Sequence, residues 1–126
     1  MSAVAAEPTL TMELWVSFVS LVRSYAGVAG LHGGDSVDVT VDGNSVALCS
    51  DYVECVMRLE RRTGAVRWNL REVTREMAAG RFELRPDGKI EQDGAEQEMD
   101  SVAIDMVARV RDRARARSQH SREGPR

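Results

Sequence analysis

Apolar residues near the start of the chain recur with a helical period, which predicts a long first helix. Thr11 stands where an N-cap would, and Leu10 and Trp15 have the spacing of a hydrophobic staple. The helix is predicted to end at Ala26 or Ala29, next to glycines that can leave the helical conformation. Its apolar positions are Met12, Leu14, Trp15, Val16, Phe18, Val19, Leu21, Val22 and Tyr25. A helix this apolar must be buried on more than one side, either within the monomer or against a second chain.

The next part of the chain alternates between apolar and polar residues, which predicts strands. Residues 36–50 form two alternating runs around a strong hairpin turn at residues 42–44. A third strand, within residues 53–60, leads through a turn at residues 62–64 to a short fourth strand that ends at Trp68.

A second helix is predicted directly after Trp68. Asn69 and Glu72 have the spacing of a capping box, and Trp68 occupies a staple position before it. Gly80 stands where a helix C′ glycine would. We therefore expect a helix over Leu70–Ala79.

The remaining chain predicts one more hairpin and a closing helix. Residues 81–85 and 89–91 flank a proline-containing turn, and this weakly apolar hairpin is expected at a sheet edge. Asp93 and Glu96 repeat the capping-box spacing before the last helix. The predicted buried stripe of that helix is Met99, Val102, Ala103, Met106, Val110 and Ala114.

These elements predict an α+β fold in two layers. The expected order is α-β-β-β-β-α-β-β-α, with a mainly antiparallel sheet of about 5–6 strands covered by the N- and C-terminal helices. Residues 9–117 are expected to form a single α+β domain, and residues 1–8 and 118–126 are expected to be disordered tails. A helix, an antiparallel meander and a closing helix resemble, in broad architecture, small adaptors of the secretion-chaperone type.

Composition indicates a globular protein whose net charge gives no strong electrostatic attraction to polyanions. The 126 residues are 43% hydrophobic and 29% charged, with a net charge of -3. The charge is arranged in blocks: residues 1–57 and 86–108 each hold seven acids and one basic residue, whereas residues 58–85 and 109–126 have an excess of arginine. Such alternation suits self-complementary packing better than a continuous nucleic-acid groove.

No catalytic residue, metal site or cofactor is predicted. Cys49 and Cys55 do not form a disulfide framework, and their spacing with His32 matches no common zinc site. A Cys–His nucleophile pair lacks a third, orienting group. The turn that begins at His32 is not accompanied by a nucleophile elbow, and the chain has no phosphate-binding glycine loop.

The sequence predicts a cytoplasmic protein without a membrane segment. The start of the chain lacks the charged and apolar regions of a secretory signal. The apolar run from Leu14 to Val22 is short and is interrupted by serines, so we do not expect it to cross a membrane.

Arginines around the third strand suggest nucleic-acid binding at first sight. They are Arg58, Arg62, Arg67 and Arg71. The capping box places Arg71 on a helix, which leaves only Arg58 and Arg67 on strands, with Glu60 close by. We therefore expect this basic region to be matched by the acidic blocks on either side of it.

Three hypotheses for the function follow. The first is a non-enzymatic protein-interaction module, a homodimeric adaptor or chaperone-like protein, in which part of the first helix is exposed in the single chain. The second is a nucleic-acid-associated regulator that uses the arginine-rich C-terminal helix, and the third is a small-ligand binder or enzyme without an identifiable motif. The candidate partner-binding residues are Trp15, Phe18, Val22, Arg109, Arg113 and Arg117.

Overall fold

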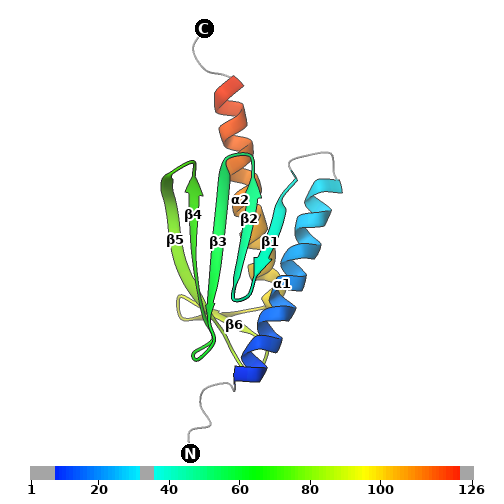
Figure 1. Ribbon diagram of the computed structural model, residues 1–126, viewed down its shortest axis with the longest axis vertical. Coiled ribbons are helices and arrows are strands. Elements are labelled where there is room, and N and C mark those ends of the chain that lie inside the picture. Colours follow the sequence, from blue (N-terminus) through cyan, green and yellow to red (C-terminus); the bar gives the residue numbers. More distant parts are fainter. Residues whose placement is uncertain (1–7, 32–35, 123–126) are drawn as a thin grey trace, which may run out of the picture.

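The chain forms an open antiparallel sheet with both of its helices packed on one face. The computed structural model describes residues 8–31 and 36–122, in which seven strands follow one another across the sheet in sequence order (Figure 1). The elements are α1 (Pro8–Leu31), β1 (Asp38–Asp42), β2 (Ser45–Ser50), β3 (Val53–Glu60), β4 (Ala65–Glu72), β5 (Arg75–Leu84), β6 (Ile90–Gln92), β7 (Ala95–Gln97) and α2 (Met99–Arg122). The predicted α+β class and antiparallel sheet are thus confirmed.

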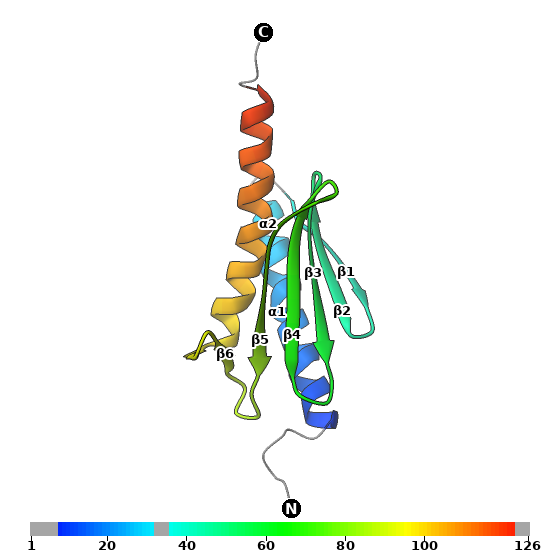
Figure 2. The same ribbon diagram turned by 90° about the vertical axis from the view of Figure 1, so that its left-hand side faces the viewer.

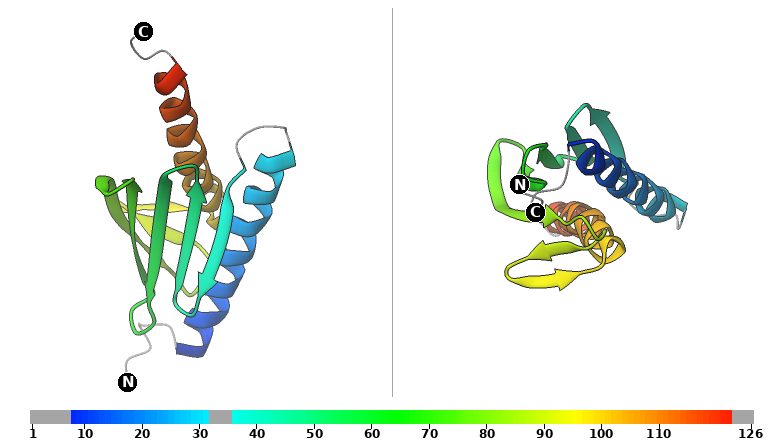
Figure 3. Two further views of the ribbon diagram at one scale, coloured as in Figure 1. Left: turned by 45° about the horizontal axis from the view of Figure 1, so that its top comes forward. Right: turned by 90° about the horizontal axis from the view of Figure 1, so that it is seen from below.

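The helices lie side by side against the sheet and leave its other face uncovered (Figure 2). Seen from below, the sheet curls so that the β6–β7 hairpin turns toward α2 (Figure 3). The core fills the space between the two layers, and its largest fully buried side chains include Trp15, Phe18, Phe82, Leu48 and Met57. The Trp15 indole also donates a hydrogen bond of 3.3 Å to the Gly43 carbonyl oxygen, which ties α1 to the β1–β2 turn.

The first helix is longer at both ends than its sequence signals suggest. It begins at Pro8, where proline is tolerated because the first turn needs no backbone N–H. Thr11 is therefore inside the helix, 1% exposed, and does not cap it. At the other end, α1 continues past Ala29 to Leu31.

The helix predicted over Leu70–Ala79 is wrong. Those residues belong to β4 and β5, which are joined by a two-residue turn at Val73 and Thr74. β4 pairs residue for residue with β3 on one side, and it pairs with β5 on the other side with one register shift between Leu70 and Arg71. These ladders satisfy the backbone and bury Trp68 and Leu70 on the helix-covered face, so tertiary pairing overrides the local capping signal.

Gly80 serves sheet packing and not a helix end. It lies directly opposite Trp68 on the neighbouring strand. A Cβ atom at this position would come within 2.7 Å of the Trp68 ring. A glycine is therefore needed for the indole to pack this closely against β5.

The second capping-box prediction is also wrong, and the strand count exceeds the predicted one. Asp93 and Gly94 form the turn between β6 and β7, both with positive φ, and α2 begins only at Met99. The sheet therefore gains one strand, β7, after Asp93, and β4 and β5 extend over the expected middle helix. At its C-terminal end α2 continues to Arg122, beyond the predicted domain end at residue 117. Residues 1–7 and 123–126 of the predicted tails lie outside the described residues.

Candidate functional site

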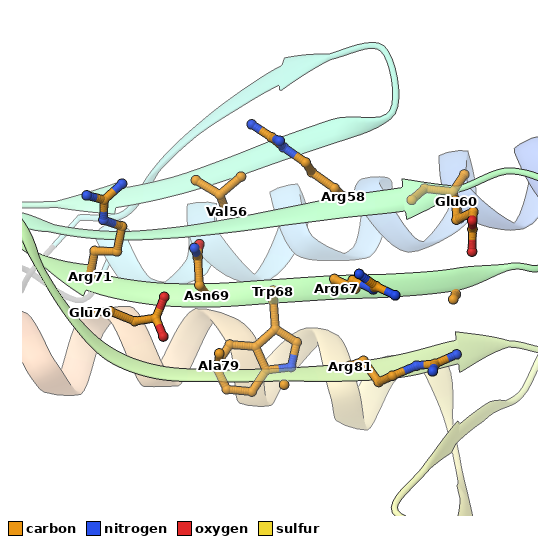
Figure 4. Close-up of a pocket in the computed structure, with 13 residues that line it drawn as sticks. Val56, Arg58, Glu60, Arg67, Trp68, Asn69, Arg71, Glu76, Ala79 and Arg81 are labelled. Carbon is orange, nitrogen blue, oxygen red and sulfur yellow. The ribbon is translucent and has the colours of Figure 1, made fainter.

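The uncovered face of the sheet, called here the outer face, holds a shallow hollow of about 930 Å³ over β3, β4 and β5 (Figure 4). The outer face is made by alternate residues of the three strands, which point away from the helices. Because these residues are paired across neighbouring strands, they form four rows, each with one residue from β3, β4 and β5. Starting near the β3–β4 turn, the rows are Glu60–Ala65–Glu83, Arg58–Arg67–Arg81, Val56–Asn69–Ala79 and Glu54–Arg71–Glu76.

One row consists entirely of arginines. Arg58 is directly opposite Arg67 on β4, which is directly opposite Arg81 on β5. Arg81 forms a 3.5 Å ion pair with Glu83. Within residues 8–31 and 36–122, neither Arg58 nor Arg67 makes an ion pair. Like charges directly opposite one another destabilise a sheet, so this arginine row is not explained by the stability of the chain itself.

The rows on either side offset the arginines and make the outer face striped. The row beyond the arginines, toward the β3–β4 turn, carries Glu60 and Glu83. On the other side comes the neutral row with Val56 at one end, followed by a row in which Arg71 stands between Glu54 and Glu76. The twelve residues of these rows include four arginines and four glutamates. The outer face therefore has alternating charge and no net charge.

The predicted candidate Arg109 packs against the sheet. Its guanidinium lies over the Trp68 ring, 4.8 Å from the ring centroid. Such a cation–π contact holds α2 on β4, with Gly80 on another side of the same indole.

Arg113 and Arg117 form a clamp with Glu72 at the end of β4. Arg113 Nε donates a hydrogen bond of 2.7 Å to Glu72 Oε1, and Arg117 Nη1 donates one of 2.9 Å to Oε2. The Arg117 guanidinium also lies 4.8 Å from the centroid of the Tyr52 ring. These contacts engage the predicted C-terminal arginines within the chain, and Arg111 is paired with Asp112 in the same helix.

The clamp lowers the pKa of Glu72 below its usual value of 4.5, first through the Arg113 hydrogen bond and then through that of Arg117. A carboxyl whose folded-state pKa is depressed stabilises the fold above its unfolded pKa, and this contribution is lost as the pH falls through the folded pKa. We expect Glu72→Gln to melt at a lower temperature than the unsubstituted chain at pH 7. The two proteins should converge once the pH is low enough to protonate Glu72.

Thermal unfolding followed by circular dichroism from pH 7 to pH 3 measures this difference. Glu13→Gln is the matched control, because Glu13 is exposed on α1 and makes no ion pair in the described part of the chain. A constant difference between Glu72→Gln and the unsubstituted chain across the whole pH range would contradict the clamp.

The predicted contact residues of α1 lie in the monomer core. Trp15, Phe18 and Val22 are 1%, 0% and 0% exposed. The expectation that one of them is partly exposed in the single chain is therefore wrong. They line the side of α1 that packs against the sheet, where the Phe18 ring centroid is 5.4 Å from that of Phe82.

By length and composition alone, α1 is also able to cross a membrane. Residues Thr9–Leu31 have a mean hydropathy of 1.4 over their most apolar stretch. The serine-interrupted run from Leu14 to Val22 thus belongs to a longer apolar helix than the sequence suggested. Core helices of water-soluble proteins meet the same criterion, and Trp15 and Phe18 of α1 pack on the sheet, while 28% of the apolar stretch is buried.

The two thiols are held in the protonated form at neutral pH. Burial raises the pKa of Cys55 to about 12. Burial, followed by the charge of Glu54, also raises the pKa of Cys49. His32 lies outside the described residues. Within residues 8–31 and 36–122 no three His, Cys, Asp or Glu side chains are placed to hold a metal ion.

Comparison with known protein families, with curated proteins and with solved structures found no match. The candidate site is therefore defined by its geometry alone.

The incorrect helix removes Arg71, Glu76 and Ala79, three of the twelve outer-face residues, from the predicted sheet. As a result, sequence reasoning did not place Arg81 or Glu76 beside the other charges. The signal that identifies Arg71 as a strand residue is the period-two alternation that runs without a break from Val66 through Arg71.

Proposed function

We propose that this chain is a non-enzymatic protein-interaction module that self-associates through the outer face of β3, β4 and β5. The observation that carries the proposal is the arginine row, in which Arg58 and Arg67 face solvent without a carboxylate partner in the described part of the chain. A carboxylate supplied by a partner opposite Arg58 would relieve part of the repulsion within this row.

The outer face has the layout of a protein interface. Its central row is neutral, with Val56, Asn69 and Ala79 at its three positions, and charged rows surround it (Figure 4). Interface cores are depleted in charged residues, and their rims are polar. The equal numbers of arginines and glutamates support a partner with the same alternation of charge, and a second copy of this chain has that alternation.

The nucleic-acid hypothesis has less support. Arg109, Arg113 and Arg117 contact the sheet, and glutamate rows interrupt the arginines of the outer face. A polyanion would require a continuous basic track.

Sedimentation velocity across a range of protein concentrations tests the proposal. Four rows about 7 Å apart on three strands about 4.8 Å apart outline a patch of roughly 10 by 20 Å between the outermost positions. Such a patch is small for a protein interface, so we expect a dissociation constant on the order of micromolar. Ala79→Glu, which adds a charge to the exposed centre of the outer face, should leave the chain monomeric throughout the range.

Ala116→Glu is the matched control, because it makes the same change at an exposed position of α2. It should associate like the unsubstituted chain, and circular dichroism should show that both variants are folded. A chain that is monomeric at millimolar concentration contradicts the proposal. So does retention on single-stranded DNA or RNA at low salt that Ala79→Glu abolishes, an outcome that would assign the outer face to nucleic acid.

A further inference from the structure

On β3 and on β5, an arginine lies on one side of the neutral row and a glutamate lies on the other side. On β3, Arg58 and Glu54 lie two residues on either side of Val56. On β5, Arg81 lies two residues from Ala79 on one side, and Glu76 lies three residues from it on the other, because the register with β4 shifts between Leu70 and Arg71 (Figure 4). Two copies can stack with their outer faces together, with a two-fold axis that runs along the neutral row midway between the two sheets. A half-turn about this axis places the arginine of one copy opposite the glutamate of the other copy, on β3 and likewise on β5.

From this symmetry we infer that the partner on the outer face is a second copy of the chain, related by a two-fold axis along the row of Val56, Asn69 and Ala79. The inference rests on the proposed function and adds the register of the dimer to it. In this register Arg58 faces Glu54 of the second copy, and Arg81 faces Glu76 of the second copy. Each pair occurs twice, because a two-fold interface is isologous.

The arrangement agrees with the way sheets pack on one another. Two sheets stack about 10 Å apart with their strands within about 30° of alignment. Small or short side chains at the axis, Val56 and Ala79, allow close approach at the centre. The charged rows then lie on either side of the axis, where long arginine side chains can span the gap to the facing carboxylates.

The central strand, β4, distinguishes this register from others, because it predicts opposite effects of charge reversal at Arg67 and at Arg58. β4 carries an arginine on both sides of the axis, Arg67 and Arg71. In the dimer these two positions face each other across the interface as like charges. Replacing Arg67 with a carboxylate therefore improves the match, whereas the same replacement of Arg58 spoils it.

Charge reversal tests the register by the sign of its effects. We expect Arg58→Glu to weaken self-association by about tenfold, and Glu54→Arg to weaken it similarly. The double variant, in which the two charges are exchanged, should associate to within about threefold of the unsubstituted chain. Arg67→Glu should associate more tightly than the unsubstituted chain. A double variant no better than the single ones, or an Arg67→Glu that weakens association, overturns the register.

Chemical crosslinking locates the axis independently. In a Cys49→Ser background, Val56→Cys and Ala79→Cys should each give covalent dimers with a short bismaleimide, because both residues lie on the axis and meet their own copies. Cys55 is fully buried and should not react. Glu60→Cys, exposed and two rows from the axis, is the control and should give few crosslinks.

The outcomes separate the register from the proposed function. Efficient crosslinking at Glu60→Cys instead of Val56→Cys, in a chain whose association Ala79→Glu still abolishes, overturns the register and leaves the proposed function in place. A chain that stays monomeric in all backgrounds and gives no crosslinks overturns both.

Discussion

Phe18→Ala should lower the free energy of unfolding by about 3–5 kcal/mol, the usual cost of removing a large aromatic side chain from a core. Phe18 is fully buried, and its ring packs between those of Trp15 and Phe82, with centroid distances of 6.1 and 5.4 Å. The truncation leaves a cavity at the place where α1 meets the sheet, and neighbours on two elements cannot both move to fill it. Chemical denaturation followed by circular dichroism measures the loss.

Val16→Ala is the matched control for this prediction. Val16 lies on the same helix but is 58% exposed, so its truncation should change the free energy of unfolding by less than about 0.5 kcal/mol. The contrast between the two variants tests whether α1 belongs to the monomer core. Similar small effects at both positions would mean that α1 is not packed on the sheet, and that its apolar face is used elsewhere.

Gly80→Ala should destabilise the chain by about 1–3 kcal/mol through overpacking. The added methyl group would lie 2.7 Å from Cζ2 and 2.8 Å from Cε2 of Trp68. The indole cannot move away easily, because it is 7% exposed and has the Arg109 guanidinium over its face. Equilibrium denaturation gives the change in stability, and Trp68 fluorescence reports the displaced ring.

Gly27→Ala is the control with the opposite expected sign. Gly27 is in α1, and an added Cβ there would meet nothing within 4 Å. Alanine is favoured over glycine in a helix by about 0.5–1 kcal/mol, so this variant should be more stable than the unsubstituted chain. If Gly80→Ala were as stable as Gly27→Ala, the close contact between β4 and β5 would be contradicted.

Most of the architecture was predictable because its signals are local. The apolar repeat of α1, the hairpin turn at Gly43 and the alternation of β3 each depend on residues near one another in sequence. The closing helix was predicted for the same reason, although its start was placed too early. These features led to the correct fold class and to an antiparallel sheet.

The β4–β5 hairpin was not predictable in the same way, since its local signals disagree. Asn69 and Glu72 have capping-box spacing, yet neither caps a helix. Glu72 instead accepts hydrogen bonds from Arg113 and Arg117, which are far along the chain. Strand pairing on both sides of β4 decides the outcome, and these partners are visible only in three dimensions.

Only the locally encoded features of the candidate site were predictable from the sequence. Arg58 and Arg67 were recognised as strand arginines from the sequence, and the alternating charge blocks suggested self-complementary packing. Register across three strands was needed to bring Arg81 and Glu76 into the same surface. A pattern that predicts a helix over Leu70–Ala79 hides the direct opposition of Arg58, Arg67 and Arg81 across the three strands.

Methyl NMR during dilution tests most directly the claim that the outer face is where two copies meet. The methyl resonances of Val56 and Ala79 should shift together as the protein is diluted through the micromolar range. Those of Val16 and Val28, exposed on α1 on the helix side of the molecule, should stay constant. Concentration-dependent shifts at Val16 and Val28 with constant Val56 and Ala79 would contradict the account, because they would place the contact between copies on the helices.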